Sequence, residues 1–78
     1  MTPTVLKKGK YRFFFYSREE KRPHVHVASA EKEAKVWLDP VVLEENHGYN
    51  SKEINEILEI IIDNKEFLLS KWDGHRGD

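Results

Sequence analysis

With 78 residues the chain is long enough for a single domain, residues 1–78, but its core must be thin, because a domain of this size buries only about 60% of its unfolded surface. Its 38% hydrophobic and 35% charged residues fit a soluble globular protein, and the absence of cysteine excludes disulfides and thiolate metal sites. No long apolar run follows Met1, so we expect a cytoplasmic protein without a signal peptide, a membrane span or a membrane partner.

The net charge of −1 hides an uneven distribution along the chain. The first third is basic, with Lys7, Lys8, Lys10, Arg12, Arg18, Lys21 and Arg22. The later part is acidic, with Glu44, Glu45, Glu53, Glu56, Glu59 and Asp63. This asymmetry is typical of a protein with one anion-attracting face, and two ordinary solvated surfaces would give the same pattern.

The first half of the chain predicts an antiparallel β-meander of three main strands, with a short fourth strand at the N-terminus. Aromatic and β-branched residues mark the strands, and the charged residues 17–22 form the loop of a hairpin. The predicted strands, in chain order, are residues 4–6, 11–16, 24–28 and 33–38.

Alternation along these strands divides their side chains between two faces of the sheet. The first face is almost entirely apolar and needs a cover: Tyr11, Phe13, Phe15, Val25, Val27, Ala34, Val36 and Leu38. The second face mixes aromatic, basic and histidine side chains: Arg12, Phe14, Tyr16, His24, His26, Lys35 and Trp37. We expect the second face to be left exposed.

Two predicted helices supply the cover. Asp39 and Pro40 have the pattern of a helix start, so a short helix is predicted through about residue 46, with Gly48 ending it. Asn50 and Glu53 form a capping-box pair at the start of a long C-terminal helix. Its apolar stripe is Ile54, Ile57, Leu58, Ile61, Leu68 and Trp72. The expected fold class is α+β, with both helices on the apolar face of the sheet.

His24 and His26 are the strongest chemical signal in the chain, because two residues one apart on a strand project to the same side. Imidazole serves in proton transfer and in metal binding, so both residues are candidate catalytic groups. A metal would need a third ligand. The candidates are Glu20, Glu33, Asp39, His47 and His75, and none has an identifying spacing, so we predict neither a metal nor another cofactor.

The same face carries candidate binding residues. Aromatic rings beside cations are the platform on which nucleic acids stack, and they are also the composition of protein-binding hot spots. The candidates are Arg12, Phe14, Tyr16, Arg22, Lys35 and Trp37. Packing of these rings under the first strand, under a loop or against a second protomer in a homo-oligomer is the structural alternative.

Several segments, read in order, resemble the bacterial domain-of-unknown-function family numbered 4160. They are residues 2–6, 11–17 (Tyr-Arg-Phe-Phe-Phe-Tyr-Ser), 23–27 (Pro-His-Val-His-Val), 35–41 (Lys-Val-Trp-Leu-Asp-Pro-Val), 48–49, 53–54 and 72–73. The resemblance implies a small prokaryotic protein encoded beside a second small protein, in the style of a toxin–antitoxin pair, and no established reaction. It also implies a histidine just before the Pro-His-Val-His stretch, where this chain has Glu20.

The leading hypothesis is therefore a component of a toxin–antitoxin-like two-gene module. It would bind a cognate small protein from a neighbouring gene, and RNA, through the face that carries His24, His26 and Trp37. The alternative is a ribonuclease or phosphodiesterase in which His24 and His26 share acid–base catalysis, with Arg12 or Lys35 stabilising the developing negative charge.

Overall fold

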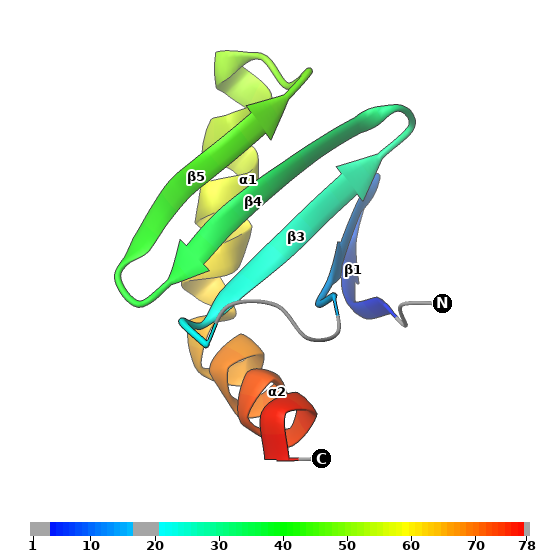
Figure 1. The fold of residues 1–78 in the computed structure, drawn as a ribbon. Helices are drawn as coiled ribbons and strands as arrows, with labels where there is room; N and C mark the ends of the chain where they lie inside the picture. The colour runs from blue at the N-terminus through cyan, green and yellow to red at the C-terminus, as the bar shows by residue number, and fades with distance from the viewer. Residues whose placement is uncertain (1–3, 17–20, 78) are drawn as a thin grey trace.

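Five antiparallel strands pair in chain order to form one sheet, with one helix on one face of it and a second helix at its end (Figure 1). The computed structural model describes residues 4–16 and 21–77, and side chains among them through residue 74. The elements are β1 (Thr4–Lys8), β2 (Tyr11–Phe14), β3 (His24–Ser29), β4 (Lys32–Leu38), β5 (Val41–His47), α1 (Ser51–Asp63) and α2 (Lys65–Gly77). The α+β class, the antiparallel meander and the first strand are confirmed, whereas the sheet has five strands instead of the predicted three main strands and a short first one, and β2 ends at Phe14 instead of residue 16.

The predicted apolar face is the core of the domain. All eight of its predicted members are buried, and Phe13, Val25, Val27, Val36 and Leu38 have no exposed surface. Ile57, Ile61 and Leu68 from the helices pack against them with no exposed surface of their own. The alternation of side chains along the strands was therefore enough to identify which face the helices cover.

The helix predicted over residues 39–46 is wrong, because residues 41–47 form β5 instead. Val41 and Leu43 face the core while Val42 between them is 46% exposed, which is the two-residue period of a strand. Asp39 does not cap a helix; its carboxylate accepts a hydrogen bond from Lys65 Nζ at 3.1 Å. An Asp-Pro pair starts turns as readily as helices, and here it lies in the turn between β4 and β5.

The prediction of one long C-terminal helix is also wrong in one respect, because the helix is broken at Asn64. The Asn64 backbone N–H still donates to Ile60 O at 3.1 Å, and its side-chain Nδ2 donates to the same oxygen at 2.8 Å. The Asn64 carbonyl then accepts from Leu68 N at 2.9 Å in the next helix. The apolar stripe is kept across this break, and α2 lies at the end of the sheet rather than continuing along α1 (Figure 1).

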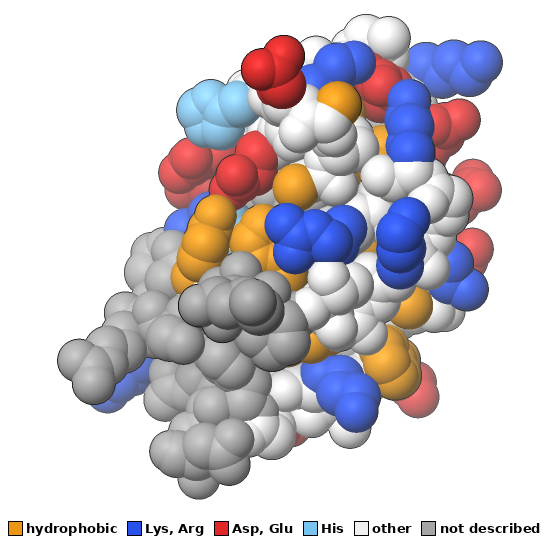
Figure 2. All heavy atoms as spheres, turned by 90° about the vertical axis from the view of Figure 1, so that its right-hand side faces the viewer, with side chains coloured by type: hydrophobic (Ala, Val, Ile, Leu, Met, Phe, Trp, Pro, Cys, Tyr) orange, Lys and Arg blue, Asp and Glu red, His pale blue; other side chains and the backbone are white. Residues whose placement is uncertain are grey.

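The two edges of the sheet carry opposite charge. β1 is one edge, with Lys7 and Lys8 exposed, and β5 is the other, with Glu44 and Glu45 exposed. Figure 2 looks onto the side where β1 lies, and lysine and arginine side chains stand over much of it. No helix in the described part of the chain is long and apolar enough to cross a membrane.

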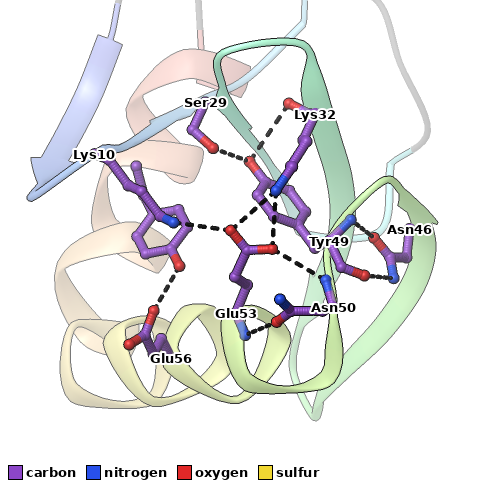
Figure 3. A network of polar contacts seen from close by, with 9 residues as sticks. Lys10, Ser29, Lys32, Asn46, Tyr49, Asn50, Glu53 and Glu56 are labelled. Atoms are coloured by element: carbon purple, nitrogen blue, oxygen red, sulfur yellow. Dashed lines mark hydrogen bonds and ion pairs between the residues drawn. The ribbon is translucent and has the colours of Figure 1, made fainter.

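A polar network joins the start of α1 to the two hairpin turns above it (Figure 3). The predicted capping box is present: Glu53 N donates to Asn50 Oδ1 at 2.8 Å, and Asn50 N donates to Glu53 Oε1 at 3.1 Å. The Glu53 carboxylate also accepts from Lys10 Nζ at 2.8 Å and from Lys32 Nζ at 3.1 Å. Glu53 is therefore a 7% exposed carboxylate that is held by two cations and a helix terminus.

The same contacts set the pKa values in this network. The hydrogen bond from Lys10, then those from the Asn50 backbone and Lys32, lower the pKa of Glu53 to about 2. The hydrogen bond to Glu53 in turn raises the pKa of Lys10. Burial raises the pKa of the Tyr11 phenol, and its 2.6 Å hydrogen bond to Glu56 adds to that shift. These groups stay in one charge state over the physiological range, as structural groups do.

Candidate binding face

The sheet face opposite the helices brings the predicted site residues together. We call it the histidine face, and it consists of Arg12, Phe14, Tyr16, Arg22, His24, His26, Lys35 and Trp37. The strand register explains the grouping, because Phe14 pairs with His26, His26 with Lys35, and His24 with Trp37. Tyr16 follows β2 and Arg22 precedes β3, so both lie at the border of this face.

The rings of the histidine face pack on one another. The His26 ring stacks on Phe14, with centroids 5.8 Å apart, and the edge of Tyr16 meets it at 4.4 Å. The His24 ring lies 5.3 Å from that of His26 and 5.6 Å from that of Trp37. These are the distances at which aromatic rings attract each other beyond simple burial.

The expectation that this face is exposed is wrong. His24 is 0%, Phe14 2%, His26 5%, and Lys35 and Trp37 each 8% exposed. One reason is the ring packing, and another is a residue from outside the sheet. Trp72 of α2 lies 4.8 Å from the His24 ring and 5.3 Å, edge-on, from Phe15 of the core face. It was predicted to be core only, and it bridges both faces because α2 lies at the end of the sheet.

Three cations lie on the aromatic rings of this face. The Arg22 guanidinium is 4.2 Å from the Trp37 ring centroid, the Lys35 ammonium is 4.7 Å from the same ring, and the Arg12 guanidinium is 4.5 Å from Phe14. Each distance is within the range of a cation–π contact. Arg22 is exposed and Arg12 is half-buried, so the accessible border of the face is basic although its centre is closed.

His24 has the contacts of a structural residue. Its Nδ1 lies 2.8 Å from the carbonyl oxygen of Arg22. A carbonyl only accepts, so Nδ1 carries the proton and donates it. This bond ties the start of β3 to the ring stack, and the complete burial of His24 separates it from any dissolved substrate. Of the two candidate catalytic histidines, His26 is the one that borders a cavity open to solvent, where a substrate could reach it.

His26 borders an open cavity of about 400 Å³ on β3, β4 and β5. Its Nδ1 lies 3.6 Å from Glu33 Oε2, and Tyr16 OH donates to the same oxygen at 3.3 Å. The other lining residues are Glu31, Ala34, Lys35, Glu45 and His47. Sequence reasoning missed Glu45 as part of this site, since residues 39–46 were assigned to a helix. The alternation of Val41, Val42 and Leu43 between half-buried and exposed was the available signal.

The five candidates for a third metal ligand are scattered. Glu33 and His47 line the cavity beside His26, and Asp39 lies in the turn where it pairs with Lys65. Glu20 and the side chain of His75 lie outside the described residues. Within the described part of the chain, no three histidine or carboxylate side chains are grouped closely enough to hold a metal ion.

Together, the fold and the face define a small α+β domain with one sheet, whose core lies on one side and a packed histidine–aromatic–basic cluster on the other. The chain belongs to the family described as Domain of unknown function (DUF4160), whose model matches residues 11–73. That segment runs from β2 into α2 and contains every residue of the histidine face and Trp72. No curated protein and no solved structure matches the chain.

Proposed function

We propose that this protein is the binding component of a toxin–antitoxin-like two-gene module and that it contacts a cognate small protein at the border of the histidine face. The observation that carries the proposal is the set of cations held over aromatic rings, above all Arg22 at 4.2 Å from Trp37. Tryptophan, tyrosine and arginine are the residues that dominate binding energy at protein interfaces. The resemblance to gene-pair proteins is the second support.

The geometry favours a carboxylate-bearing partner. A guanidinium that lies on an indole keeps its in-plane N–H donors available, and those donors match a carboxylate in a two-bond fork. Arg22 is exposed and has no ion-pair partner among the described residues. RNA fits less well, because stacked bases need open ring faces and the rings here are at most 8% exposed for Phe14, His26 and Trp37.

The test is a binding titration of the purified protein with the product of the adjacent gene. We expect a complex whose affinity falls at least tenfold in Arg22→Glu, because the guanidinium is replaced by a repelling carboxylate. Lys52→Glu, an equal charge change at an exposed position of α1, is the matched control and should bind within twofold of the native protein. The absence of a complex, or equal binding by Arg22→Glu with its circular dichroism unchanged, contradicts the proposal, as does displacement of the partner by a short RNA at equal concentration.

A second function is favoured by one observation, the position of His26 at the cavity with Lys35 and with Glu33, whose Oε2 is 3.6 Å from His26 Nδ1 and would have to come closer to form a hydrogen bond. A carboxylate orients an imidazole as a general base, and a nearby ammonium stabilises the charge that develops on a phosphate oxygen. In this alternative the protein cleaves RNA or another phosphodiester, with His26 as the reacting group and His24 as a positioning residue.

This alternative predicts that His26→Ala lowers the rate of cleavage of a fluorogenic RNA by about 100-fold or more, the usual contribution of a general acid or base. His47→Ala removes an imidazole from the same cavity without touching the pair of His26 and Glu33, and it should keep most of the activity. Normal cleavage by a folded double variant, His24→Ala with His26→Ala, would eliminate this function.

A further inference from the structure

We infer that the open edge of β1 receives an acidic, extended segment of the partner protein as an additional strand of the sheet. The inference rests on the proposed function for the existence of that partner, and it adds where and how the partner binds. Its basis is the open edge of β1 together with Lys7 and Arg12, two cations that stand opposite each other in the ladder.

No carboxylate of the described residues neutralises the cations at this edge. Lys7 stands directly opposite Arg12 in the ladder, an arrangement in which like charges repel. Lys7 Nζ donates to Gly9 O at 3.0 Å, and Arg12 reaches only the Thr4 hydroxyl, at 3.4 Å. Among the described residues, no carboxylate pairs with either of them or with Lys8. Lysine and arginine side chains gather on the side of the molecule where β1 lies (Figure 2), which favours the binding of an anionic group there.

Three other lysines do have carboxylate partners. Lys10 and Lys32 share the Glu53 carboxylate at 2.8 Å and 3.1 Å, and Lys65 pairs with Asp39 at 3.1 Å. Arg22, Lys52 and Lys71 also have no carboxylate partner among the described residues. What distinguishes the edge is that two such cations, Lys7 and Arg12, stand opposite each other on neighbouring strands, and this fits an anionic group supplied by another molecule.

The edge itself offers backbone groups. β1 has β2 as its single neighbour in the sheet, so one side of the strand has no ladder partner among the described strands. An incoming extended chain would form main-chain hydrogen bonds there and place alternate side chains on either face. Carboxylates on one side would meet Lys7 and Arg12, and apolar residues on the other would meet Leu6, which is half-buried against the core.

A second copy of this chain suits the edge less well. Two β1 strands would bring lysines together, and two β5 strands would bring Glu44 and Glu45 together. Pairing of β1 with β5 of another copy has the right charges, but Glu44 already accepts from Trp37 Nε1 at 3.1 Å and Glu45 lies 3.2 Å from His47. Such a contact is also head-to-tail and would continue from copy to copy. The charge pattern therefore points to a different, acidic chain.

The test uses the full ¹⁵N-labelled protein and a ten-residue peptide in which glutamate alternates with valine. We expect amide shifts concentrated at residues 5–8 and slower amide exchange there. A peptide of equal charge with prolines in place of the two central valines cannot complete the ladder and should bind at least tenfold more weakly. Raising the salt from 50 to 300 mM should weaken the binding severalfold.

Two double variants distinguish peptide binding at the β1 edge from nonspecific attraction to positive charge. Lys7→Glu combined with Lys8→Glu should lower peptide affinity at least tenfold. We expect this variant to fold, because a glutamate at position 7 stands opposite Arg12 and forms a favourable cross-strand pair. The matched control is Lys52→Glu combined with Lys71→Glu, two exposed helical positions, which should stay within twofold. Equal binding by the proline peptide, equal binding by a twelve-nucleotide oligouridylate at residues 5–8, or pairing of the chain with itself there would each overturn the inference.

Binding measurements with the adjacent gene product distinguish a failure of this inference from a failure of the proposed function. If Arg22→Glu abolishes its binding while the Lys7 and Lys8 double variant binds normally, the proposed function stands and the edge inference is wrong. If the peptide adds to β1 but the gene product binds nowhere, the edge accepts acidic strands and the proposed function is wrong.

Discussion

Trp72→Ala is expected to remove a large part of the stability of the domain. The ring is 4% exposed and contacts Phe15 of the core face and His24 of the histidine face. Replacing a buried aromatic residue with alanine costs about 3–5 kcal/mol. Domains have about 0.05–0.15 kcal/mol of stability per residue, about 4–12 kcal/mol for a domain of this length, so the cost is from about a quarter to the whole of its stability. Urea denaturation followed by circular dichroism measures the change in the free energy of unfolding.

Phe67→Ala is the matched control, an aromatic side chain on the same helix that is 42% exposed. Since little apolar surface is lost there, the change should be below about 1 kcal/mol. If both variants unfold at the same urea concentration, the contacts of Trp72 do not hold α2 on the sheet. A native midpoint for Trp72→Ala would contradict the docking of α2 altogether.

The second expected result is a loss of stability in acid that depends on Glu53. Its pKa is lowered in the folded protein, by Lys10 first and then by Asn50 and Lys32, from 4.5 to about 2. Between these values the unfolded chain binds a proton at Glu53 and the folded chain does not, so stability falls as the pH falls. The contribution is fully present above about pH 4.5, is lost progressively below it and has gone once the pH is below about 2.

Urea midpoints at pH 7, 4.5, 3 and 2 would show this. We expect Glu53→Gln to be less stable than the native protein at pH 7 and to lose less of its remaining stability between pH 4.5 and pH 2. Glu59→Gln, at an exposed position of α1, should follow the native curve. Parallel curves for Glu53→Gln and the native protein would show that the network around Glu53 does not contribute to the pH dependence.

The sheet could be predicted from the sequence because its signals are local. Alternating side chains assigned every buried residue of the core face, from Tyr11 to Leu38, and the same alternation placed His24 and His26 with Trp37. The capping box of Asn50 and Glu53 gave the start of α1 for a similar reason, since both partners lie within one helical turn.

The errors came from patterns that two structures share. Asp39 and Pro40 suit a helix start and a turn equally, and only the pairing of Val41 and Leu43 with β4 decides between them. The apolar stripe runs on from Ile61 to Leu68 whether or not the helix breaks between them, so nothing in its period revealed the break at Asn64.

The missed helix break at Asn64 also explains why the candidate site was wrongly predicted to be exposed. A straight helix would keep Trp72 on the core side of the sheet, and the rings of the second face would then lack one of their neighbours. Because α2 lies at the end of the sheet, Trp72 meets His24 and the face is closed at its centre. Its composition was therefore predictable, whereas its burial required the three-dimensional path of the chain.

The meander has a consequence for the order in which the domain assembles. Every strand pairs with its neighbour in sequence, so the sheet closes only short loops, and such local pairings form early and quickly. The contacts of Trp72 with Phe15 and His24 join residues that are 57 and 48 positions apart in the sequence, and they need α2 to be in place. During synthesis the histidine face is thus completed only after α2 has left the ribosome, so a partner that recognises it would select molecules in which α2 has emerged and docked.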